Sequence, residues 1–391
     1  MFNDIVQFSF PTTILFGRRA IGRLPDCLGE LGVRKPLIVT DQGLVEAGLV
    51  NRVTTVLQTA GIPYGVFSGV RPDPRIEDVE GGAASFRAHA CDGVIGFGGG
   101  SSLDVAKVVP VLATQDGPLT RYDILTGGNK NIRGPLPPLV LIPTTSGSGS
   151  EVGRCSVIID PSLSRKFLVC HPLLLAKRAI LDPELTVGLP PLLTAATGID
   201  AFAHNIESLV CPVFHPMCDA IALKGIEFVA RYLERAVKDP GDVEARGFMM
   251  LAAMMGAVAF QKDLGATHSL AHALSSVCSI PHGLAIAMCL VPVMKYNQDV
   301  SAAGYAQVAR CFGIETAGLS DREASEKAIR AVADLLPRLG IPRNLAAAGV
   351  EKGRLADVAR TAFEDPCHQT NPRPCRMEDL HGLLRAAYGS K

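Results

Sequence analysis

Short apolar runs rich in Val and Ile recur through the first half of the chain, and stretches with helical periodicity separate several of them. The runs are Leu37–Thr40, Tyr64–Ser68, Gly93–Phe97 and Leu139–Thr145, and the helical stretches include Val45–Thr59 and Arg75–His89. Because continuous apolar runs are typical of strands buried on both faces, the pattern predicts a parallel sheet between two layers of helices. The first half is therefore expected to be an α/β domain with a Rossmann-like sheet.

Helical periodicity dominates after about Pro190, where the strand signals almost vanish. Segments rich in Ala, Leu and Met follow one another at Leu193–Val210, Cys218–Val237, Asp242–Phe260 and Ser320–Leu336. Two prolines in Gly188–Pro191 would interrupt any continuing element, which places a boundary there. The sequence thus predicts an α/β domain over residues 1–189 and an all-α domain over residues 190–391.

The composition narrows the class of protein. Of the 391 residues 48% are hydrophobic and 19% charged, which suits a large buried core. Lys plus Arg and Asp plus Glu both number 38, so the formal charge is zero and no surface for nucleic acid or anionic membranes is expected. Eleven cysteines without a CxxC pair are expected to be free thiols in a reducing compartment.

The apolar segments do not predict a membrane protein. The start, MFNDIVQFSFP, has none of the features of an export signal. The longest apolar stretches, Leu251–Phe260 and Gly283–Met294, fall short of the roughly 20 residues that a membrane span needs. We therefore expect a cytoplasmic globular protein and, given its motifs, an enzyme.

A glycine-rich turn between a strand and a helix marks the first candidate site. Asp92–Lys107 reads DGVIGFGGGSSLDVAK, where Gly98–Gly100 allow close approach of a bound group, and Ser101 and Ser102 are expected to cap the helix. Free N–H groups and the positive end of the helix dipole favour an anion there. The run does not continue as GxGxxG, so a tight turn without a ligand is the alternative.

Two further strand ends support a nucleotide site. Asp41 follows the run Leu37–Thr40, where a carboxylate can accept both ribose hydroxyls of an adenosine and repel a 2′-phosphate. The other interpretation of Asp41 is an ordinary helix N-cap. Pro143–Glu151 (PTTSGSGSE) adds a loop of hydroxyls after another strand. Three strand-end sites together favour a nucleotide cleft.

Histidine is scarce, with nine in the chain, yet four of the nine lie near one aspartate in the helical half. Asp200 and His204 are four residues apart, so a helix places them on one face, and His268 and His272 repeat that spacing. His282 follows in a Pro-His-Gly turn. One carboxylate and three imidazoles would form a site for Fe²⁺ or Zn²⁺ and leave one histidine spare. The spacing leaves open which histidine that is.

These motifs together resemble the iron-dependent (group III) alcohol dehydrogenase family over essentially the whole chain. The segments that carry the resemblance are GGGSSLD at Gly98–Asp104, IPTTSGSGSEV at Ile142–Val152, LDPEL at Leu181–Leu185, LTAATGIDAFAHNIE at Leu193–Glu207, HSLAHAL at His268–Leu274, PHG at Pro281–Gly283 and NPR at Asn371–Arg373. The resemblance implies a nucleotide domain, a helical domain and a divalent metal in the cleft between them, in a homodimer.

The resemblance also implies roles for single residues. The metal ligands would be Asp200, His204, His268 and His282, with Fe²⁺ expected and Zn²⁺ the alternative. His272 would be the catalytic histidine that relays a proton near the substrate. The residues that would contact NAD are Asp41, Gly99, Gly100, Ser101, Thr144, Thr145, Ser148 and Lys166. Many relatives contact the cofactor through the Asn of a Pro-Asn-Pro turn, where this chain has Pro72-Asp73-Pro74.

The expected reaction is hydride transfer between NAD(H) and an alcohol or aldehyde, with the metal as Lewis acid. The alternative is a dehydroquinate-synthase-like lyase that uses NAD and a metal, but such an enzyme needs many Lys and Arg around its substrate. A further hypothesis concerns Lys262, six residues before His268. Either it lies on a solvated helix face, or it holds an acidic group of a hydroxy acid or semialdehyde. Cys367 and His368 are expected near the same pocket by family analogy.

Overall fold

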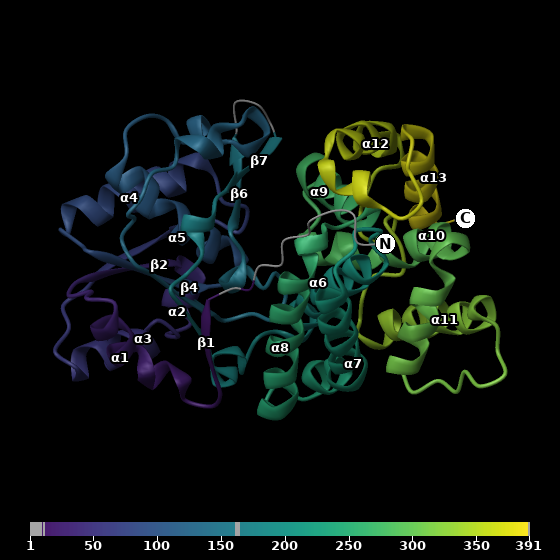
Figure 1. Ribbon diagram of the computed structural model, residues 1–391, viewed down its shortest axis with the longest axis horizontal. Coiled ribbons are helices and arrows are strands. Elements are labelled where there is room, and N and C mark those ends of the chain that lie inside the picture. Colours follow the sequence, from purple (N-terminus) through teal and green to yellow (C-terminus); the bar gives the residue numbers. More distant parts are fainter. Residues whose placement is uncertain (1–9, 11, 161–164, 390–391) are drawn as a thin grey trace. The chain divides into compact units, whose positions relative to one another are not determined.

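The computed structural model describes residue 10, residues 12–160 and residues 165–389 (Figure 1). This part of the chain divides into two units. The α/β unit comprises the described residues of 10–145 and 149–186, and the helical unit comprises residues 146–148 and the described residues from 187 onward. The loop predicted to bind a nucleotide therefore contributes residues to both units.

A six-stranded parallel sheet forms the centre of the α/β unit, as far as the described residues show. Its order is β1-β8-β5-β4-β2-β3. The bounds are β1 (Thr13–Phe16), β2 (Pro36–Asp41), β3 (Gly65–Val70), β4 (Gly93–Gly98), β5 (Leu139–Pro143) and β8 (Arg178–Leu181). All four predicted strands are confirmed, whereas β1 and β8 were not predicted because each is only four residues long.

Alternate residues of the strands are buried against two separate apolar cores. Leu37 and Val39 of β2 pack into one core, and Ile38 between them packs into the other. The helices of this unit are α1 (Leu24–Glu30), α2 (Gln42–Glu46), α3 (Asn51–Thr59), α4 (Ile76–Ala88) and α5 (Gly100–Thr114). The continuous apolar runs thus arise because both faces of the sheet are covered.

One predicted helix, Val45–Thr59, is wrong as a single element. The chain instead forms α2, turns, and starts again as α3. Gly48 has a φ of 71° in the turn, a left-handed conformation that glycine adopts without steric cost. The apolar periodicity continues across this turn, so periodicity alone did not reveal it.

A separate antiparallel hairpin joins β6 (Cys155–Asp160) to β7 (Arg165–Cys170). Cys155 and Cys170 face each other at one end of this pair and form a disulfide. The prediction that all eleven cysteines are free thiols is therefore wrong for these two, and the other nine are free. Their separation of 15 residues gave no CxxC signal, and only the strand pairing brings them together.

The helical unit contains the long helices predicted after Pro190. They are α6 (Pro191–Val210), α7 (Pro216–Lys238), α8 (Val243–Ala259), α9 (Ala266–Cys278), α10 (His282–Cys311), α11 (Asp321–Arg338), α12 (Leu355–Glu364) and α13 (Met377–Tyr388). Pro191 is the first residue of α6, where its missing N–H costs no hydrogen bond. Pro190 and Pro191 therefore mark the start of α6 as well as the boundary between the two predicted domains.

Helix α6 lies deep in the apolar core of this unit and packs against α7, α8 and α10. Glycines allow the close approach: a Cβ on Gly256 of α8 would lie 2.8 Å from the Cβ of His204. The segment Val243–Lys262 is long and apolar enough to cross a membrane by length and composition, which corrects the expectation that no apolar stretch reaches that length. In this structure most of it, 61%, is buried, as in the core helix of a globular protein.

The disulfide leads to a direct prediction. Protein purified without reductant, denatured and alkylated should carry nine labels, and eleven after reduction. Because the bond closes a loop of 15 residues, reduction should lower the free energy of unfolding of the α/β unit by about 3 kcal/mol. Mass spectrometry and urea unfolding measure both effects. Eleven labels without reduction would contradict the pairing.

Candidate functional site

The first candidate site is built on one face of α6. Asp200, His204 and Glu207 follow one another at intervals of four and three residues, so their side chains lie on the same side of the helix. All three are at least 95% buried. Because α6 is enclosed by other helices, this face is held away from solvent.

Helices α9 and α10 each place one histidine near Asp200. Three imidazole Nε2 atoms lie near a single oxygen, Asp200 Oδ1. The distances are 3.7 Å from His204, 3.7 Å from His268 and 3.5 Å from His282. His282 reaches this position as the first residue of α10, directly after Pro281. The four residues predicted as metal ligands thus meet at one point of the helical unit.

The charges of this cluster depend strongly on burial and on one another. Burial alone would raise the pKa of Asp200, but His204, His268 and His282 hold that pKa well below its usual value. Burial lowers the pKa of His204 to about 4. Burial also acts to lower the pKa of His268, yet the carboxylates of Glu207 and Asp200 raise it to about 9. An ionised carboxylate and a neutral imidazole are the forms that bind metal.

The residues present fit a divalent metal ion. Asp200 Oδ1 and His268 Nε2 are buried, and neither has a hydrogen-bond partner among the described residues. Such orphaned atoms are costly unless a ligand satisfies them. Asp200, His204 and His268 offer donor atoms within 4.8 Å of one another. Nitrogen and carboxylate donors at these separations suit Zn²⁺ or Fe²⁺.

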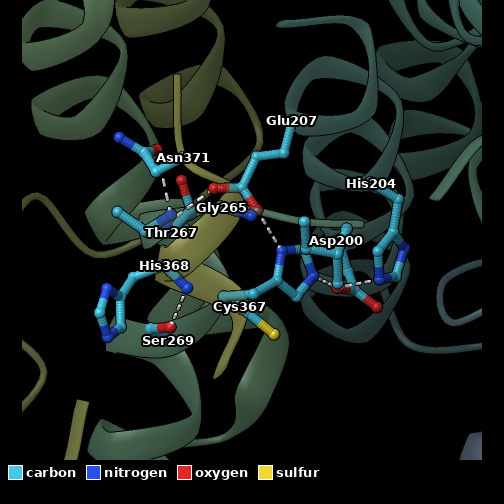
Figure 2. A network of polar contacts seen from close by, with 12 residues as sticks. Asp200, His204, Glu207, Gly265, Thr267, Ser269, Cys367, His368 and Asn371 are labelled. Carbon is cyan, nitrogen blue, oxygen red and sulfur yellow. Dashed lines mark hydrogen bonds and ion pairs between the residues drawn. The ribbon is translucent and has the colours of Figure 1, made fainter. Parts of the chain in front are cut away.

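Glu207 is the last residue of the motif Leu193–Glu207, but the sequence did not predict that it acts at the site. Its Oε2 accepts a hydrogen bond from His268 Nδ1 at 2.5 Å, and its two oxygens also accept from the N–H groups of Gly265 and Thr267. Figure 2 shows Glu207 beside Gly265 and Thr267 at the start of α9. Burial would raise the pKa of Glu207, but His268 and Thr267 lower it. The spacing of Asp200, His204 and Glu207 was the signal that could have found it.

The fourth histidine, His272, is engaged differently. Its Nδ1 lies 2.8 Å from Asp365 Oδ2, and its ring stacks on that of His282 at a centroid distance of 5.2 Å. Asp365 caps η10 (Pro366–Thr370) and also accepts a hydrogen bond from Ser269. Burial acts to raise the pKa of Asp365, but His272 holds it well below its usual value. Sequence reasoning missed Asp365 because it lies 93 residues from His272.

Two residues expected near this pocket are found beside it. The Sγ of Cys367 lies within 4.8 Å of donor atoms of His272 and Asp365. Burial raises the pKa of the Cys367 thiol well above its usual value, which keeps the thiol protonated. His368 is buried, and its Nε2 lies 2.9 Å from the carbonyl of Phe363. Figure 2 shows both on the segment that follows α12.

The second candidate site lies at the carboxyl ends of β2, β4 and β5 in the α/β unit. The chain runs from β2 outward to β3 and then returns to β4 on the other side, so the strand order reverses between β2 and β4. A crevice at such a reversal is where open parallel sheets bind ligands. Asp41 ends β2, and Gly98 ends β4. The sheet order therefore explains why these two segments form one site.

The glycine turn at the end of β4 leaves the start of α5 open. Gly98 has a φ of 151°, and a Cβ there would lie 2.6 Å from Ser102 Oγ, so only glycine fits. No described side chain caps α5 at Gly99, which leaves the first N–H groups of a 15-residue helix for an anion. The expectation that the serines cap α5 is wrong. Ser101 instead donates to the carbonyl of Pro72, and Ser102 donates to Asp41.

Asp41, Thr144 and Thr145 lie beside this turn. Asp41 caps α2 by accepting from Leu44 N–H at 3.0 Å, and its other oxygen accepts from Ser102 Oγ at 3.2 Å. The N-cap interpretation is therefore correct and compatible with a place in the crevice. Thr144 N–H donates to the carbonyl of Gly98 at 2.9 Å, and a Cβ on Gly99 would lie 3.5 Å from Thr145. Apart from the cap of α2, these contacts are with the glycine turn or with α5.

Two predicted cofactor residues are not placed in the crevice by the structure. Ser148 belongs to the part of its loop that is grouped with the helical unit. Lys166 lies in β7, and its side chain falls outside the described residues. Gly100 is the first residue of α5 and completes the turn.

The structure places Lys262 away from solvent and beside a carboxylate of this chain. It lies in η8 (Phe260–Lys262), its side chain is 3% exposed, and its Nζ donates to the carboxylate of Asp219. The solvated-face interpretation is therefore wrong. Because the ammonium already has a carboxylate partner, its charge is neutralised without a substrate.

Two family models match the chain, one over each half. The model described as "Iron-containing alcohol dehydrogenase" matches residues 11–183, and that described as "Fe-containing alcohol dehydrogenase family, C-terminal" matches residues 194–388. The chain is 38% identical to the choline dehydrogenase of Bacillus subtilis (97% of this chain, 94% of that protein) and 40% identical to the 4-hydroxybutyrate dehydrogenase of Cupriavidus necator (93% and 95%). The chain belongs to the iron-containing alcohol dehydrogenase family.

The fold agrees with solved members. The structure of the sulfoacetaldehyde reductase of Bifidobacterium kashiwanohense in complex with NAD⁺ superposes with a TM-score of 0.89 at 27% identity, covering 100% of both chains. The family finding also decides between the two enzyme classes considered from the sequence. This member of the family is an oxidoreductase of the alcohol dehydrogenase type, and the lyase alternative is not needed.

Proposed function

We propose that this enzyme transfers a hydride between NAD(H) and an alcohol/aldehyde pair at a divalent metal held by Asp200, His204, His268 and His282. The observation that carries the proposal is the convergence of three imidazole Nε2 atoms on Asp200 Oδ1. Fe²⁺ is the proposed metal, in keeping with the family, and Zn²⁺ is the alternative. A bound ion supplies a Lewis acid that lowers the pKa of an alcohol or polarises an aldehyde.

The proposed role of His272 is to carry the hydroxyl proton. Its Nδ1 is engaged with Asp365, so Nε2 is the nitrogen that can accept a proton from the substrate side. The side chain is 23% exposed, more than that of His204 or His268, which gives it access to water. A histidine with this access is suited to passing a proton on to water. The alternative is that His272 orients its neighbour His282.

For the cofactor, we propose that residues 1–189 bind NAD and residues 190–391 bind the metal. The open start of α5 would hold the pyrophosphate and Asp41 the adenosine ribose. The proposed contacts are Asp41, Gly99, Gly100, Ser101, Thr144, Thr145, Ser148 and Lys166. The solved relative with NAD⁺ supports this choice of cofactor. A homodimer is proposed from the family resemblance, and a cytoplasmic location from the cysteines, of which nine are free.

The substrate is proposed to be a small primary alcohol or its aldehyde, extended to hydroxy acids and their semialdehydes. The relative named 4-hydroxybutyrate dehydrogenase supports this extension. Lys262 does not support it, since its Nζ is bonded to Asp219. Recognition of an acidic group would therefore depend on another cation.

Metal retention tests the ligand set. His268→Ala and His282→Ala should each lose bound Fe²⁺ or Zn²⁺ on dialysis and almost all activity, because each removes a donor atom. His272→Ala should keep the metal and lower kcat by about 10²–10⁴-fold, with an altered pH profile. Elemental analysis and steady-state kinetics measure both. Loss of metal from His272→Ala with retention in His268→Ala would reverse the assignment.

Cofactor preference tests Asp41. The wild type should use NAD better than NADP by more than about 100-fold in kcat/KM, because a 2′-phosphate near this carboxylate costs several kcal/mol. Asp41→Asn keeps an acceptor for Leu44 N–H and removes the charge, so it should reduce the preference by about tenfold or more. Equal use of both cofactors by the wild type would exclude this role.

A matched pair of substrates tests Lys262. The ratio of kcat/KM for 4-hydroxybutyrate to that for 1-butanol should stay within about twofold in Lys262→Met, since the ammonium is already paired. The melting temperature should fall because the ion pair between the buried ammonium and the partly exposed carboxylate of Asp219 is broken. A tenfold drop in the ratio would instead make Lys262 the cation that holds the acidic group.

A further inference from the structure

We propose that Glu207 is a positioning residue of the metal centre, which fixes the ring of His268 so that its Nε2 is the metal-binding atom. The inference rests on the proposed function, because it takes Asp200, His204, His268 and His282 as the ligands. It assigns to Glu207 a contribution to metal affinity without direct contact with the ion.

The hydrogen bonds of Glu207 fix the ring. His268 Nδ1 lies 2.5 Å from Glu207 Oε2, and both side chains are more than 95% buried. A carboxylate only accepts, so Nδ1 must carry the hydrogen in this contact. In a neutral imidazole the lone pair is then on Nε2, the atom 3.7 Å from Asp200 Oδ1. Carboxylate–histidine pairs of this kind orient metal ligands and raise their basicity.

Besides holding His268, Glu207 caps the start of α9, and an experiment must distinguish these two roles. Its oxygens also accept from Gly265 N–H at 3.1 Å and Thr267 N–H at 2.7 Å, at the start of α9. Asn371 shares this task, because its Oδ1 accepts from Ala266 N–H at 3.2 Å. Figure 2 shows Glu207 and Asn371 together at this helix start. Loss of either side chain should therefore weaken the helix end.

Of Glu207 and Asn371, only Glu207 contacts His268. Among the described residues, the side-chain hydrogen bonds of Asn371 are with Ala266, Asn297, Arg373 and Cys375, and none is with His268. Asn371→Ala is therefore a matched control that removes one acceptor from the same helix end. A purely structural role of Glu207 predicts the same behaviour for both variants.

Glu207→Gln is the closest change in shape. Three N–H donors face the two oxygens of Glu207, so an amide NH₂ in place of either oxygen meets at least one donor. With NH₂ at Oε1 it meets only Thr267 N–H, and the carbonyl that then faces His268 Nδ1 is uncharged; with NH₂ at Oε2 the hydrogen bond to His268 is lost as well. Both orientations remove the carboxylate charge that holds the ring. Loss of such a partner lowers metal affinity by about 10–100-fold.

The experiment measures Zn²⁺ affinity by chelator competition and the melting temperature of metal-free protein for wild type, Glu207→Gln and Asn371→Ala. We expect both variants to melt lower without metal, whereas Zn²⁺ affinity falls about 10–100-fold only in Glu207→Gln. The ¹⁵N spectrum of histidine-labelled, Zn²⁺-loaded protein should show His268 protonated at Nδ1 in wild type and Asn371→Ala.

Three results would overturn the inference. Wild-type affinity in Glu207→Gln would show that Glu207 serves the helix end alone. An equal loss of affinity in Asn371→Ala would assign the effect to the helix end and not to the contact with His268. A wild type that binds no Zn²⁺ would overturn the proposed metal centre and, with it, this inference. Because the first two results both require a wild type that binds Zn²⁺, failure of the inference alone can be told from failure of the proposed function.

Discussion

The structure of the helical unit depends on a buried carboxylate, Asp200, whose Oδ1 faces three imidazole nitrogens and has no hydrogen-bond partner among the described residues. An isolated buried charge is expensive, because water solvates an ion far better than a protein interior does. The surrounding imidazoles offset this cost in part, and a cation bound among the four side chains would offset more. Helices α6, α9 and α10 each contribute a side chain of this cluster.

The two histidines of α9 are both held through Nδ1 by a carboxylate from another segment. Glu207 holds His268, and Asp365 holds His272. His268 lies near Asp200, whereas His272 stacks on His282. A carboxylate at Nδ1 thus orients two histidines at different positions around the cluster. The two histidines differ in their surroundings: His268 Nε2 faces the buried carboxylate of Asp200, whereas the His272 side chain is 23% exposed.

The sequence predicted much of this because the relevant signals are local. The i,i+4 spacing of Asp200 with His204 and of His268 with His272 identifies a shared helix face, and a continuous apolar run identifies a strand buried on two sides. The disulfide, Asp365 and the partner of Lys262 were missed because each depends on a contact between segments far apart in sequence. The break between α2 and α3 was missed for a different reason, since one glycine with positive φ interrupts a pattern that otherwise continues.

Lys262 illustrates how far a local pattern can mislead about chemistry. Its distance of six residues from a metal ligand suggested a cation for a substrate acid, but folding brings Asp219 of α7 to its ammonium. A lysine that is 3% exposed needs such a partner, because its desolvated charge would otherwise be lost or the fold disrupted. Asp219 lies one turn into α7, so the pair connects the segment before α9 to a helix that packs on α6. In this structure Lys262 thus contributes to the contact of η8 with α7, beside the helices that carry the histidine cluster.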